Sequence, residues 1–170
     1  MTALLRLSTW LSRAALIVAG IALLAMMMVT VVDVVLRYAF DLSNGASGLV
    51  IIGSVELVSY LLMFSLLAAM AAHVERSQVV VEVFTQALPA TVKARVAGVY
   101  LLVFAAAGVV IALGIIDEAH SAAEFGEVTQ DLALPKAPLY YLAVALFLLF
   151  AVRSAIHGLQ GLIQGVSHDA

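Results

Sequence analysis

The 170-residue chain is 65% hydrophobic and 11% charged, with a formal net charge of −3. Soluble proteins average about 45–50% apolar and about 25% charged residues, so this composition and a mean hydropathy of +1.15 predict an integral membrane protein. The absence of cysteine excludes disulfides, thiolate metal sites and cysteine nucleophiles, and the dispersed basic residues argue against a nucleic-acid partner.

Two apolar segments in the first half of the chain are long enough to cross a membrane. We expect spans at residues 14–36 and 49–72, because about 20 apolar residues in a helix cross a hydrocarbon core of about 30 Å. Asp33 and Arg37 lie four residues apart and can pair on one helical face; a proton or ion site is the alternative. Turn-forming residues at 41–48 predict the connecting loop.

Glu56 is the one charged side chain between Leu49 and Ala72. An acid inside a membrane span is a functional candidate by default, because it usually faces a bundle interior, a cavity or a partner. Its place near the start of the span leaves two interpretations open. Glu56 either forms a hydrogen bond to a polar residue of a neighbouring subunit or couples transport to an ion.

The segment at residues 77–88 has a different pattern. Val83 and Phe84 fall on one helical face, whereas Gln78 and Glu82 fall on the other. About a dozen residues are too few to span a bilayer, so we expect an amphipathic helix that lies in the membrane interface and ends before Pro89. A short strand is the alternative, but an unpaired strand at a bilayer surface would leave backbone groups without partners.

Two further spans are expected at residues 96–116 and 139–156. The third span is rich in glycine and alanine, which predicts close helix packing and a central position, against this bundle or a partner. Between these spans, residues 117–137 are expected to form a polar, acidic loop. Arg153 is expected to extend to the membrane interface, and residues 158–170 to form a short polar tail.

The basic residues predict the orientation of the chain. On the side of the N-terminus the expected topology places Arg6, Arg13, Arg76, Lys93, Arg95 and Arg153, whereas Arg37 and Lys136 lie on the other side. Short cytoplasmic loops carry the excess of Lys and Arg, so we expect both termini in the cytoplasm. The sequence therefore predicts one all-α integral membrane domain, residues 1–170, with four transmembrane helices and one interfacial helix.

No catalytic motif is present: the chain has no HExxH zinc motif, phosphate-binding glycine loop or GxSxG elbow. We expect neither an enzyme nor a catalytic, cofactor-binding or metal site. Two alternatives remain open. One is a haem-bearing membrane anchor of a redox complex, in which His73 and His157 would meet at one end of the bundle. The other is an independent four-helix carrier that uses Glu56 as its ion-coupling acid.

Several short motifs occur in an order that resembles a known family. They are Leu36-Arg37-Tyr38-Ala39-Phe40, Val55-Glu56-Leu57, Ser77-Gln78-Val79-Val80-Val81-Glu82 and Ala87-Leu88-Pro89. Their order and spacing resemble the small, DctQ-like membrane subunit of the tripartite ATP-independent periplasmic (TRAP) transporters of bacteria and archaea. In that family the first helix ends in Arg-x-x-Phe, the second begins with Trp and a Glu-Glu pair, and the following loop carries His-hydrophobic-x-Asp before Leu-Pro.

The chain departs from this family pattern at several positions. Val55 replaces the first acid of the pair, the tryptophan before it is absent, Gln78 replaces the histidine and Glu82 replaces the aspartate. The candidates for structural or partner contacts are Arg37, Glu56, Gln78, Glu82, Phe84 and Pro89.

The resemblance implies a scaffold subunit that does not itself translocate solute. In such systems a periplasmic binding protein captures the solute, often a carboxylate, and a large membrane subunit carries it inward by an elevator movement coupled to sodium. The expected partners of this chain are therefore the large subunit, the periplasmic binding protein and the lipid bilayer. The expected location is the inner membrane, which the chain crosses several times.

Overall fold

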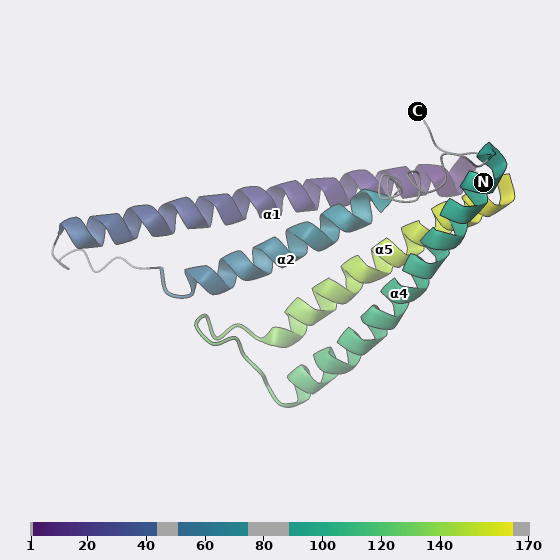
Figure 1. Cartoon of the computed structure of the whole chain (residues 1–170). Coiled ribbons are helices and arrows are strands. Elements are labelled where there is room, and N and C mark those ends of the chain that lie inside the picture. Colours follow the sequence, from purple (N-terminus) through teal and green to yellow (C-terminus); the bar gives the residue numbers. More distant parts are fainter. Residues whose placement is uncertain (1, 44–50, 75–88, 165–170) are drawn as a thin grey trace.

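The computed structural model describes residues 2–43, 51–74 and 89–164 (Figure 1). Within these ranges the chain forms four long helices: α1 (Thr2–Leu42), α2 (Ser54–Ala72), α4 (Ala90–Glu124) and α5 (Lys136–Gln164). Each helix contains a stretch long and apolar enough to cross a membrane, which confirms the expected all-helical membrane architecture. The expected interfacial helix at residues 77–88 lies outside the described residues.

The helices pack as two antiparallel pairs, α1 with α2 and α4 with α5 (Figure 1). Helix α5 also packs against α2 and, over a smaller area, against α1, so it is the central helix of the described bundle. The close packing expected for residues 96–116, against this bundle or a partner, is found here with α5. These residues belong to α4, which packs mainly against α5 because the glycines of the two helices meet.

Several helix boundaries differ from the expected span limits; α1, for example, runs from Thr2 to Leu42 rather than over residues 14–36. Helix α2 begins at Ser54 rather than Leu49, because Gly53 has a left-handed backbone with φ +75°. Helix α4 continues to Glu124, so the acidic stretch from Asp117 to Glu124 is helical rather than a loop. Helix α5 continues to Gln164, which places half of the expected tail in a helix. Polar sequence ends a membrane span but does not end a helix, since Ala and Glu favour helix in water as well.

Small residues fill the inside of the bundle, and large apolar residues cover its outside. Among the most buried residues are Ala68, Ala71, Ala112 and Ala119. Trp10, Ile21, Met28 and Val110 are, by contrast, each more than 60% exposed. Alanine and glycine let helix backbones approach closely where lipid removes the hydrophobic drive for association. This distribution is the one expected for helices that are surrounded by hydrocarbon.

Glycines bring α4 and α5 into backbone contact at one end of the pair. A Cβ atom built at Gly98 would lie 2.7 Å from the carbonyl oxygen of Gly158. A Cβ atom at Gly161 would lie 2.9 Å from the carbonyl oxygen of Ala94. No side chain fits at such distances, so these positions hold the two helices at their closest approach.

Helices α1, α2 and α5 share the main apolar core, which contains Ala19, Phe64, Ala68, Ala143 and Leu146. Serine hydroxyls add hydrogen bonds between α1 and α2. Ser65 donates to the carbonyl oxygen of Ala19 at 3.0 Å, and Ser12 donates to that of Ala72 at 2.9 Å. These bonds set the antiparallel register of the two helices.

The glycine contact predicts that Gly98→Ala destabilises the chain, whereas Gly114→Ala does not. A methyl group at position 98 forces α4 and α5 apart, and we expect the free energy of unfolding to fall by about 1–3 kcal/mol. Nothing lies within 4 Å of a Cβ atom at Gly114, so alanine there should be neutral or slightly stabilising. Thermal unfolding of the two purified variants in detergent measures the difference. Equal melting temperatures would contradict the contact.

Candidate functional site

Glu56 lies in the first turn of α2 and binds the backbone of the loop between α4 and α5. Its Oε2 atom accepts hydrogen bonds from the backbone N–H groups of Asp131 and Leu132, both at 3.0 Å. The hydroxyl of Thr129 also donates to the carboxylate. These contacts, together with Gly53, form what we call the Glu56 clamp, which ties the start of α2 to the loop that leads into α5.

Gly53 makes room for this contact. It precedes α2 with φ +75°, a conformation that side chains with a Cβ rarely adopt. A Cβ atom at this position would lie 2.7 Å from Cγ of Leu132. The sequence therefore needs glycine here for two reasons, backbone conformation and the close approach of Leu132.

The clamped loop has a compact structure of its own. The N–H of Thr129 donates to the carbonyl oxygen of Leu134 at 2.8 Å, and the Thr129 hydroxyl oxygen accepts the N–H of Leu134 at 3.1 Å. Lys136 forms an ion pair with Glu127 at 3.0 Å. Because its own backbone groups are paired, the loop presents Glu56 with two N–H groups in a defined position.

These contacts bear on the two interpretations of Glu56. The carboxylate binds main-chain groups of its own chain, and the expectation from sequence did not include a partner in the distant loop. An acid whose lone pairs accept several hydrogen bonds is well suited to hold a loop. The arrangement provides structural hydrogen bonding and contains no reactive group positioned for catalysis.

The other candidate residues do not gather around Glu56. Arg37 forms an ion pair with Asp33 at 2.8 Å on α1, and the Arg37 side chain is 58% exposed. Pro89 caps the start of α4, where its carbonyl oxygen accepts the N–H groups of Val92 and Lys93. The remaining candidates, Gln78, Glu82 and Phe84, lie outside the described residues.

A second polar cluster lies where α1 begins, and sequence reasoning assigned its central residue wrongly. The side chain of Arg153 is fully buried between the helices, whereas the expectation was a side chain that extends outward. Its Nη1 atom donates to the carbonyl oxygens of Ala71 and Ala72, the latter at 2.7 Å, and its Nε donates to Ser8 Oγ at 3.1 Å. The carbonyl groups at the end of α2 have no intrahelical partners, and Arg153 satisfies them.

His157 completes this cluster, which we call the Arg153 network. Its Nε2 atom lies 2.9 Å from Ser8 Oγ. Because Ser8 Oγ already accepts a hydrogen bond from Arg153, its own proton can be donated to the imidazole. The network joins α1, α2 and α5 through Ser8, the end of α2 and Arg153. The sequence signal for it was a charged residue followed four positions later by a histidine on one helical face.

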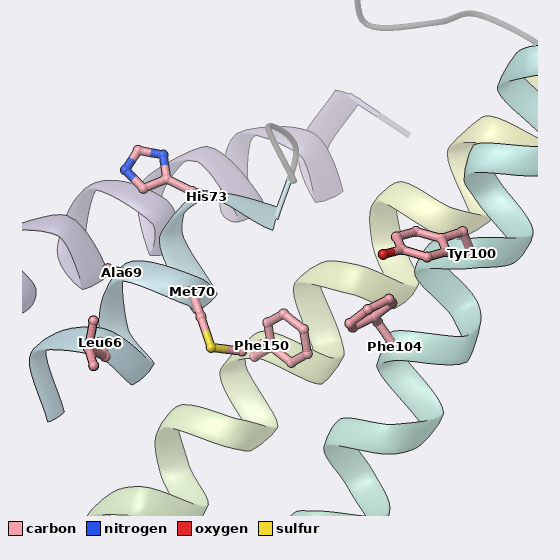
Figure 2. Close-up of a pocket in the computed structure, with 7 residues that line it drawn as sticks. All are labelled: Leu66, Ala69, Met70, His73, Tyr100, Phe104 and Phe150. Carbon is pink, nitrogen blue, oxygen red and sulfur yellow. The ribbon is translucent and has the colours of Figure 1, made fainter. Parts of the chain in front are cut away.

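The two histidines of the haem alternative occupy different environments. His157 belongs to the Arg153 network, whereas His73 lines an open groove between α2 and the α4–α5 pair. Figure 2 shows Leu66, Ala69, Met70 and His73 on the α2 side and Tyr100, Phe104 and Phe150 on the other side. The groove has a volume of about 390 Å³ and mostly apolar walls. In the described part of the chain, no three His, Cys, Asp or Glu residues are grouped as metal ligands.

Comparison with known proteins gives one match. The family model described as "Tripartite ATP-independent periplasmic transporters, DctQ component" matches residues 26–163, which include the second part of α1, all of α2 and α4, and α5 up to its last residue. No curated protein and no solved structure was found to match the chain.

The Glu56 clamp predicts that Glu56→Ala loosens the loop while Glu56→Gln largely retains it. Alanine removes the acceptor of the Asp131 and Leu132 N–H groups, whereas the amide oxygen of glutamine can still accept them. We expect severalfold faster hydrogen exchange at Asp131 and Leu132 in Glu56→Ala. Glu118→Ala, on the exposed side of α4, is the control and should leave the exchange unchanged. Identical exchange in all variants would show that Glu56 does not hold the loop.

The Arg153 network predicts that Arg153→Met strongly destabilises the bundle. The substitution leaves the carbonyl group of Ala71 without its Arg153 donor and that of Ala72 with Ser12 as its donor, which should lower the free energy of unfolding by roughly 3 kcal/mol. Arg95→Met, which removes an exposed arginine of α4, should change it little. The free energy of unfolding of each purified variant is measured by titration with a denaturing detergent, and the two values are compared. A small change in the free energy of unfolding for Arg153→Met would show that the Arg153 network does not stabilise the bundle.

Proposed function

This chain belongs to the family of DctQ components of the tripartite ATP-independent periplasmic transporters, and we propose that it is the scaffold subunit of such a transporter. That family is a family of transporter components rather than of enzymes, and its members are small membrane subunits. In this proposal the chain braces a large membrane subunit in the bilayer while the large subunit moves the solute. The family match over residues 26–163 is the observation that carries the proposal.

The use of charge inside the bundle supports a scaffold role. Glu56 and Arg153 both bind backbone groups, Glu56 in the loop before α5 and Arg153 at the end of α2. One fixes the start of α2 to the loop before α5, and the other fixes the end of α2 to α5 itself. Helix α2 is thus held to α5 at both ends, which suits a subunit that keeps one shape while a neighbouring subunit moves.

The finer features of the proposal follow the family resemblance. We place the chain in the inner membrane, with a sodium-coupled large subunit and a periplasmic binding protein that delivers a carboxylate solute. We place both termini in the cytoplasm. This orientation is supported by Arg6, Arg13, Lys93 and Arg95, which lie near the starts of α1 and α4 at one end of the bundle (Figure 1).

The alternative carrier function requires Glu56 to bind and release an ion. Its carboxylate is occupied by the loop backbone, which supports a structural role for Glu56 instead. The haem-anchor alternative requires two histidines on facing helices. His157 forms a hydrogen bond with Ser8 while His73 lines the groove, so no observation favours this alternative.

The proposal is tested by reconstitution in liposomes. We expect that this chain alone takes up no solute, that it co-purifies with the large subunit, and that the two together with the binding protein take up solute in a sodium gradient. The variant Glu56→Gln should support uptake close to the wild-type rate, because its amide oxygen still holds the loop. Uptake by this chain alone would overturn the scaffold function. Loss of uptake in a folded, assembled Glu56→Gln variant would favour the carrier.

A further inference from the structure

We draw no further inference here: the strongest candidate, the open groove between α2 and the α4–α5 pair that His73, Tyr100 and Phe104 line, has mostly apolar walls, and nothing in the structure shows what covers them.

Discussion

The buried guanidinium of Arg153 determines how the described helices are joined. A charge without partners is costly inside a membrane protein, so Arg153 has to lie where it finds acceptors. It finds them at the end of α2, where the last carbonyl groups have no intrahelical partner, and in Ser8 of α1. One side chain of α5 thereby satisfies α2 and connects it to α1. The positions of these three helices at this end follow from that set of hydrogen bonds.

Glu56 performs the equivalent task at the other end of α2. Its carboxylate binds backbone N–H groups of the loop before α5, and Gly53 gives Leu132 the space to approach. Between the two polar ends, the contacts depend on small side chains and on serine hydroxyls such as that of Ser65. The bundle is thus fixed by polar contacts at its ends and by close backbone packing along its length. Charges that are bound to backbone in this way suit a rigid membrane scaffold.

The unequal lengths of α1 and α2 set the shape of the bundle where α2 begins. Helix α2 is shorter than α1, and the clamp holds the loop before α5 against the first turn of α2. Helix α1 continues past this turn with exposed apolar residues and with the ion pair of Asp33 and Arg37 (Figure 1).

Composition and hydropathy by themselves determined that this is a helical membrane protein with four spanning segments, because hydrophobic length is a local property of the chain. Short motifs such as Arg37 to Phe40 and Glu56 were sufficient to indicate the family, which the match over residues 26–163 then bore out. The sequence did not place Arg153 inside the bundle or α5 at its centre. Those features depend on residues far apart in the chain, such as Ser8 with Arg153 and Glu56 with Leu132. Only the tertiary structure decided them, because a buried charge is stable only where packing brings acceptors from several helices to it.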